Sequence, residues 1–187
     1  MAALRLVEDG DTIILDTGTT TYELARLLGE KRNITVVTND LPIALLLEEF
    51  EAVRVVVVGG MVRRKFHCTV ASSFSGMNAL SDLIVDKAFM AVNGFSLEKG
   101  ASTPDLNHSE TKKIMISIAA RVILLFDSSK MGRNSFAIFA PPDRIDAVVT
   151  DFLHDEEKRQ MEESGIEPIL ADSGGPHLNG ATGPTRT

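Results

Sequence analysis

The sequence predicts an α/β fold, with a mostly parallel central sheet and helices on both faces, from two observations. Apolar runs of strand length recur along the 187 residues, and most are continuous in Val, Ile and Leu, as in strands buried on both faces of a parallel sheet. Helical patterns separate these runs, which is the order of right-handed βαβ units. The predicted strands are Thr12–Asp16, Ile34–Thr38, Val53–Val58, Lys87–Val92, Arg121–Phe126, Asp146–Asp151 and Ile166–Ala171.

Five segments between the strands have helical periodicity. Gly29 and Gly165 stand where glycines commonly end helices. Thr19 or Thr20 is expected to cap the first helix, with Glu23 as its capping-box partner. The predicted helices are Thr20–Gly29, Leu41–Glu51, Ser72–Leu83, Asn107–Ala120 and Asp155–Ser164.

The chain is expected to form one domain over residues 1–171. Phe95–His108 breaks the strand–helix rhythm, and we expect a long polar loop there, a kind of segment that is often functional. Residues 172–187 are rich in Gly, Pro, Thr and Ser, which predicts a disordered tail. Because the first strand pattern begins within about a dozen residues of Met1, we also expect that an N-terminal domain is missing.

Composition restricts the function. The net charge is −7, and the one dense basic cluster is Arg63–Lys65, so this segment is not expected to bind DNA. The single Cys68 fits a reducing compartment. The apolar runs are too short to span a bilayer and no signal peptide is visible, so a cytoplasmic location without membrane contact is expected.

Polar and glycine residues follow five of the predicted strands. The segments are Asp16–Thr21, Thr38–Asp40, Gly59–Gly60, Asn93–Gly94 and Asp127–Lys130. Parallel strands bring their carboxyl ends to one edge of the sheet, where open α/β folds bind ligands. The alternative is that these are ordinary polar turns.

The sharpest of these segments is Gly18-Thr19-Thr20-Thr21, which opens a predicted helix. Backbone N–H groups and hydroxyls there would suit a phosphate. The segment is neither a Walker A loop nor a dinucleotide fingerprint, because the Gly-Lys-Ser/Thr ending and the spaced glycines are absent. Simple helix capping is the alternative.

Other candidates have equally plain alternatives. Gly60 would let the backbone approach a ligand, or would form a tight turn, and Arg63 would reach a phosphate or be solvated. Glu110 and Lys113 share a helix face and would close over a polyol, or form a surface ion pair. Lys130, after Asp127, has the same two readings.

No metal, cofactor or catalytic nucleophile is expected. His67, Cys68 and His108 have no spacing that resembles a zinc motif. Ser72-Ser73 lacks a nucleophile-elbow motif.

Taken together, the motifs resemble the C-terminal effector-binding domain of DeoR-type transcriptional repressors over about residues 6–151. The matching strings are Asp9-Gly-Asp-Thr-Ile-Ile-Leu-Asp-Thr-Gly-Thr-Thr-Thr21, Thr35-Val-Val-Thr-Asn39, Val58-Gly-Gly60 with Arg63, Val85-Asp-Lys-Ala-Phe89, Thr103-Pro-Asp-Leu106 with Glu110-Thr-Lys-Lys113, and Asp127-Ser-Ser-Lys130.

The resemblance implies a fold similar to ribose-5-phosphate isomerase and the CoA-transferase-like proteins. It implies a phosphorylated sugar or related intermediate as effector, a homo-oligomer (dimer or tetramer), and operator DNA contacted only through an N-terminal winged helix-turn-helix domain. The effector-binding residues it implies are Asp16, Gly18, Thr19, Thr20, Thr21, Asn39, Gly60, Arg63, Asn93, Glu110, Lys113 and Lys130.

The chain departs from the family pattern at two places. Asn93-Gly94 replaces a common Asp-Gly, and Ala71-Ser72 replaces a Gly-Pro. A sugar-phosphate isomerase on the same fold is the rival reading, but residues 92–96 hold no carboxylate and only Glu110 remains as a possible base. A domain that only oligomerises is a third reading. We expect a sensor and not an enzyme.

Overall fold

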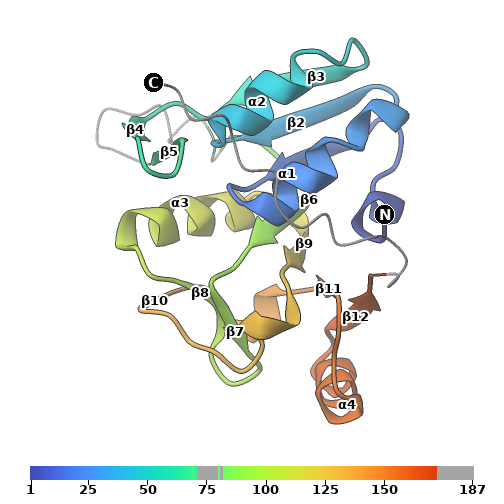
Figure 1. Cartoon of the computed structure of the whole chain (residues 1–187), viewed down its shortest axis with the longest axis vertical. Coiled ribbons are helices and arrows are strands. Elements are labelled where there is room, and N and C mark those ends of the chain that lie inside the picture. The colour runs from blue at the N-terminus through green and yellow to red at the C-terminus, as the bar shows by residue number, and fades with distance from the viewer. Residues whose placement is uncertain (71–79, 81, 172–187) are drawn as a thin grey trace, which may run out of the picture.

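A computed structural model describes residues 1–70, 80 and 82–171. Its centre is a seven-stranded sheet of order β12-β11-β9-β6-β1-β2-β3, in which every neighbouring pair is parallel (Figure 1). The strands are β1 (Thr12–Leu15), β2 (Ile34–Thr38), β3 (Val53–Val57), β6 (Val85–Ala91), β9 (Ala119–Leu125), β11 (Ala147–Thr150) and β12 (Glu167–Leu170). The predicted mostly parallel α/β sheet is confirmed.

Helices cover both faces of this sheet, and each face has its own apolar core. The helices are α1 (Thr19–Ala25), α2 (Leu41–Leu47), α3 (Leu106–Ser117) and α4 (Asp155–Glu163). Side chains alternate along β1, so that Ile13 and Leu15 join the core under α1 and α2, while Ile14 joins the core under α3 and α4. Short 3-10 turns add η1 (Ala3–Leu6), η2 (Leu28–Glu30), η4 (Ser128–Lys130) and η5 (Pro142–Arg144).

The ends of two helices agree with sequence signals. Asp40 caps α2 by accepting the Ile43 N–H at 2.9 Å. Gly165 follows α4 with a φ of 78°, and its N–H donates to the Glu162 carbonyl while Ile166 N–H reaches Met161, as in a Schellman motif.

The predicted cap of α1 is wrong. Its N-cap is Gly18, without a side-chain cap, so Thr19 and Thr20 lie inside the first turn. Glu23 instead pairs with Arg26 at 3.0 Å. The predicted helix end at Gly29 is also wrong, because α1 ends at Ala25 and Gly29 lies in η2.

Five short strands were not predicted. β4 (Met61–Arg63) and β5 (Cys68–Val70) form a hairpin, and β7 (Gly94–Ser96), β8 (Gly100–Thr103) and β10 (Ala137–Ala140) form an antiparallel sheet of order β10-β8-β7. The expectation of one long loop over residues 95–108 is therefore wrong. The short β7–β8 hairpin, rich in Gly and Ser, lacks the continuous apolar run that marks a buried strand.

Two of the predicted segments lie partly or wholly beyond the described residues. The predicted helix over residues 72–83 lies largely outside the described residues, as does the tail at 172–187. Within the described parts of the chain, no helix has the length and apolar character to cross a membrane.

Candidate functional site

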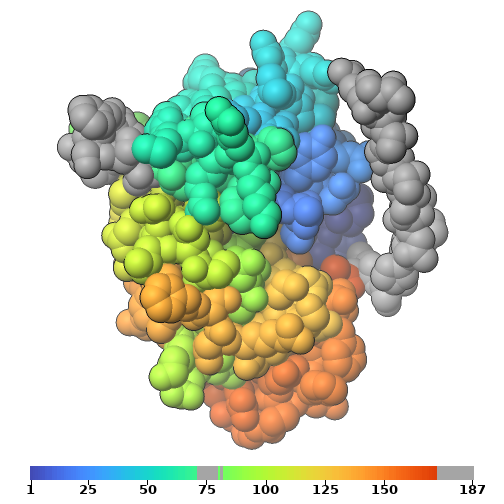
Figure 2. Space-filling view, turned by 60° about the vertical axis from the view of Figure 1, so that its left-hand side comes forward, coloured from blue at the N-terminus to red at the C-terminus, as the bar shows by residue number. Residues whose placement is uncertain are grey.

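A cavity of about 620 Å³ opens at the carboxyl ends of the central strands. Figure 2 shows how distant parts of the sequence meet on this face: the teal β4–β5 hairpin, the blue start of α1, the yellow-green α3 and the amber segment after β9. The cavity is lined by side chains from the β1–α1 turn, the end of β2, the end of β6, the β8–α3 segment and the end of β9. The polar residues that follow the parallel strands in the sequence predict this location.

The β1–α1 turn supplies the upper wall of the cavity. Gly18 lies against β6, where an added Cβ would come within 2.8 Å of the Ala91 Cβ, so no side chain fits. Thr19 and Thr20 line the cavity, and both are exposed. Thr21 is buried and its hydroxyl donates to the Gly18 carbonyl at 2.8 Å. Two of the three threonines therefore line the cavity.

A buried ion pair lies at the base of the cavity. Lys112 Nζ contacts Asp16 Oδ2 and also donates to the Ala91 carbonyl at 2.9 Å, while the Ala91 N–H donates to Asp16 at 3.0 Å. The ammonium group also lies 4.9 Å from the centre of the Phe139 ring. The pair thus joins the ends of β1 and β6 to α3. Lys112 lines the cavity, whereas Asp16 lies behind the lining and positions Lys112 and Ala91.

The sequence did not single out Lys112. It selected Lys113 instead, which pairs with Glu110 at 2.8 Å on the exposed face of α3. Neither Glu110 nor Lys113 lines the cavity. The helical period offered a usable signal, because His108 and Lys112 are four residues apart and share the buried stripe of α3 with Met115.

Asn39, Gly60 and Arg63 also lie outside the cavity lining. Asn39 is buried and donates from Nδ2 to the Thr69 carbonyl at 2.9 Å. Gly60 lies against the backbone of β5 at Val70, where a Cβ would collide with the carbonyl oxygen. Arg63 pairs with Asp105 at 2.6 Å. All three shape the β4–β5 hairpin, and Arg63 ties it to the start of α3.

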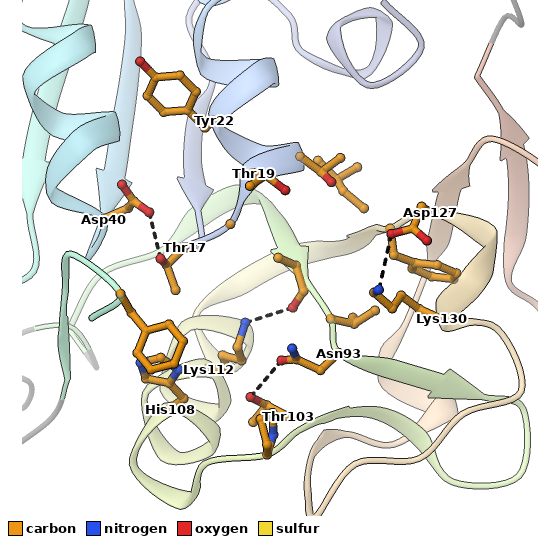
Figure 3. Close-up of a pocket in the computed structure, with 18 of the residues that line it drawn as sticks. Thr17, Thr19, Tyr22, Asp40, Asn93, Thr103, His108, Lys112, Asp127 and Lys130 are labelled. Carbon is orange, nitrogen blue, oxygen red and sulfur yellow. Dashed lines mark hydrogen bonds and ion pairs between the residues drawn. The ribbon is translucent and has the colours of Figure 1, made fainter. Parts of the chain in front are cut away.

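Asn93 and Lys130 do line the cavity, at its lower and right-hand sides in Figure 3. Asn93 Oδ1 accepts a hydrogen bond from the Thr103 hydroxyl at 3.2 Å. Lys130 Nζ lies 3.6 Å from Asp127. The Ser129 hydroxyl first, and the charge of Lys130 next, hold the pKa of Asp127 below its usual value. Lys130 Nζ also donates to the Ser129 hydroxyl oxygen at 3.2 Å, and its ion pair with Asp127 is long and partly exposed.

The opposite side of the cavity combines an acid with aromatic rings. Asp40 accepts a hydrogen bond from the Thr17 hydroxyl at 2.7 Å, and burial raises the pKa of Asp40. The His108 ring packs edge-on against Phe66 at 5.5 Å, and burial lowers the pKa of His108. These residues were not among the predicted binding residues, although Asp40 belongs to a strand end that the sequence marked.

Cys68 lies behind this side. Its Sγ is 3.3 Å from His108 Nε2, and burial raises the pKa of the thiol. Among the described residues, no group of three or more His, Cys, Asp or Glu side chains is placed to hold a metal ion.

Residues 1–152 match the protein family described as the DeoR C terminal sensor domain. The chain belongs to this family. Its curated relatives include the HTH-type transcriptional regulator IolR of Bacillus subtilis, 34% identical over 84% of this chain and 62% of that protein. The lactose phosphotransferase system repressor of Staphylococcus epidermidis is 34% identical over 89% of this chain and 65% of its own length. The HTH-type transcriptional repressor GlcR of Bacillus subtilis is 32% identical over 91% of this chain and 65% of its own length.

The sensor domain thus spans less than two thirds of the length of these relatives. They are transcriptional regulators, a non-enzymatic family, which confirms the DeoR resemblance and the expectation of a sensor and not an enzyme.

Solved structures confirm the predicted fold. A D-ribose-5-phosphate isomerase in complex with phospho-erythronic acid matches with a TM-score of 0.50 and 21% identity, over 69% of this chain and 49% of that chain. Subunit eIF2B delta of Chaetomium thermophilum matches with a TM-score of 0.51 and 18% identity, over 78% of this chain and 51% of that chain. At these identities the likeness concerns the fold alone.

Proposed function

We propose that this sensor domain binds a phosphorylated sugar in the cavity at the strand ends. Binding there modulates the contact of a winged helix-turn-helix domain with operator DNA, in the cytoplasm and within a homo-oligomer. The main support is that the Thr19 and Thr20 hydroxyls and the Lys130 ammonium group all line one cavity, although they come from different strand ends.

These groups suit a phosphate. A phosphate offers only acceptor oxygens, and hydroxyls, free backbone N–H groups and an ammonium are donors. The first-turn N–H groups of α1 have no partner within the helix, so they are available at the same place. Lys130 is available because its ion pair with Asp127 is long, at 3.6 Å, and its hydrogen bond at 3.2 Å goes to the neutral Ser129 hydroxyl, which leaves donors of the ammonium group for a ligand.

The rest of the cavity suits a small polyol. Asn93 and Thr103 supply amide and hydroxyl groups beside the phosphate donors. A volume of about 620 Å³ lies within the usual range for small-ligand sites, roughly 300–1,000 Å³. One relative is named for the lactose phosphotransferase system, which agrees with a sugar-derived effector.

The net charge of −7 supports a DNA contact made by another domain. The proposed binding set leaves out seven of the residues that the family resemblance implied, because none of them lines the cavity: Asp16, Thr21, Asn39, Gly60, Arg63, Glu110 and Lys113.

A thermal-shift screen tests this function. The domain is mixed with aldose and ketose phosphates and, in parallel, with the same sugars lacking phosphate. A ligand at about 100 times its Kd stabilises the folded state by about 2.7 kcal/mol, which raises the Tm of a domain this size by roughly 5–11 °C. We expect such a shift from at least one phosphate and not from its parent sugar.

Matched threonine variants locate the binding. Thr20→Val removes a hydroxyl that lines the cavity, and Thr35→Val makes the same change on β2, at the other end of the sheet. The ligand-induced shift should fall in Thr20→Val and persist in Thr35→Val. A shift that is equal in both variants would contradict the phosphate assignment.

A further inference from the structure

The cavity has two ends of different chemistry. Figure 3 shows Asp40 and Thr17 on one side, Asp127 and Lys130 on the other, and Lys112 between them. Asp40 follows β2 and Lys130 lies after β9, and the order β9-β6-β1-β2 places three strand spacings between them, roughly 14 Å. A ligand that touches both ends must therefore be elongated and carry a different group at each end.

Four carboxylates line the cavity, and three of them have a cationic partner. The pairs are Glu23–Arg26 at 3.0 Å, Asp105–Arg63 at 2.6 Å and Asp127–Lys130 at 3.6 Å. Asp40 is the fourth, and within the described part of the chain it has no ion-pair partner. The acid end of the cavity is therefore uncompensated.

Asp40 is also the carboxylate in the lining that is most withdrawn from water. It is 6% exposed, and its oxygens accept from neutral donors only: the Thr17 hydroxyl at 2.7 Å, the Ile43 N–H at 2.9 Å and the Gly18 N–H. Burial raises the pKa of Asp40, and the nearby charge of Asp16 raises it further. A buried carboxylate without a cation is costly, and a ligand that brings a cation would offset that cost.

The carboxylate can still accept such a group. A carboxylate has about four acceptor positions, and the Thr17 hydroxyl, the Ile43 N–H and the Gly18 N–H occupy three of them. An ammonium group is a compact donor, which suits the remaining acceptor position.

We propose that the effector is an amino sugar phosphate, with its phosphate held by Thr19, Thr20 and Lys130 and its ammonium group held by Asp40. This inference rests on the proposed function, because it assumes that the Lys130 end binds phosphate. It adds that Asp40 determines specificity by selecting an amine over a hydroxyl.

Two pairs of compounds test the inference by calorimetry. Glucosamine 6-phosphate is compared with glucose 6-phosphate, and galactosamine 6-phosphate with galactose 6-phosphate, so that each pair differs only in an amine or a hydroxyl. At least one amine should bind about tenfold more tightly than its partner, because a charge-assisted hydrogen bond is roughly twice as strong as a neutral one. Amines that bind no better than the hydroxyl compounds would overturn the inference.

Two Asp→Asn substitutions at opposite ends of the cavity test which carboxylate is responsible for the preference for an amine over a hydroxyl. Asp40→Asn removes the charge and keeps the cap of α2, because Asn caps as well as Asp. It should reduce the preference for the amine to less than about twofold. Asp127→Asn should leave the ratio of the two affinities unchanged, even if both affinities shift. A preference that survives Asp40→Asn would overturn the role of Asp40.

The two proposals fail in different ways. Equal binding of amine and hydroxyl phosphates, both tighter than their parent sugars, would overturn the inference and leave the proposed function standing. Binding of glucosamine that depends on Asp40, with no gain from its phosphate, would overturn the proposed function instead.

Discussion

Lys112 and Lys113 are neighbours in the sequence and opposites in the structure. Lys112 is 4% exposed, pairs with buried Asp16 and lines the cavity, whereas Lys113 pairs with Glu110 on the outer face of α3. A helix turns by about 100° per residue, so adjacent side chains point to different environments. The difference shows that the same residue type stabilises the site at one position and is solvated at the next.

The largest expected effect is on stability at the inner position. Lys112→Met leaves the Asp16 carboxylate buried without its cation, so the free energy of unfolding should fall by about 3–5 kcal/mol. Urea denaturation measures it. The double variant Asp16→Asn with Lys112→Met should be more stable than Lys112→Met alone. A loss below about 1 kcal/mol in the single variant would mean that the pair is solvated.

A smaller effect on stability is expected from His108, which lies one turn before Lys112 on the same face of α3. Burial first and the charge of Lys112 second hold the pKa of His108 below its unfolded value of about 6.5. As pH falls below about 6.5, the unfolded chain takes up this proton more readily, so stability is lost until the folded pKa is passed.

His108→Gln removes that contribution. The variant should lose less stability than the wild type between pH 7.5 and pH 5, by about 1.4 kcal/mol for each unit that separates the folded and unfolded pKa values. Urea denaturation at several pH values gives the difference between the two proteins, which cancels the other titrating groups. Parallel curves for the two proteins would contradict a buried neutral His108.

The smallest effect is expected at the outer position. Lys113→Met and Glu110→Gln each break an ion pair in which both side chains are about half exposed, at 49% and 61%. Such pairs contribute little, so the free energy of unfolding should change by less than about 0.5 kcal/mol. Urea denaturation under the same conditions as for Lys112→Met checks this, and a change above about 1 kcal/mol would remove the contrast between the two lysines.

The sequence predicted the central sheet because its strands are apolar runs, and the strands between the two edge strands β3 and β12 are largely buried on both faces. β2 has the predicted bounds, Ile34–Thr38, and the other central strands lie within two residues of theirs. The small strands β7 and β8 escaped prediction because Gly, Ser and Ala in runs of three or four residues resemble a polar loop. They are distinguished by their pairing in the structure, where β7 pairs with β8 and β8 pairs with β10.

Some residues of the site could likewise be predicted from the sequence, and others could not. Thr19, Thr20, Asn93 and Lys130 follow parallel strands, and topology alone brings them to one cavity. Lys112 enters it through the rotation of α3. Residues such as Phe66 enter it through the path of the β4–β5 hairpin, and a single strand pattern gives no signal for either.

Binding of a phosphorylated sugar in the strand-end cavity is tested by the dissociation constant of one ligand measured in two lysine variants. The ligand is the sugar phosphate with the largest thermal shift. Lys130→Met removes a cation that lines the cavity and, unlike Lys112, is not held in a buried ion pair, and Lys113→Met removes a cation outside the cavity. We predict that Kd rises at least about tenfold in Lys130→Met and stays within about twofold in Lys113→Met, since a hydrogen bond to a charged group contributes about 1.5–3 kcal/mol. Equal dissociation constants in the two variants would contradict phosphate binding by Lys130 in the cavity.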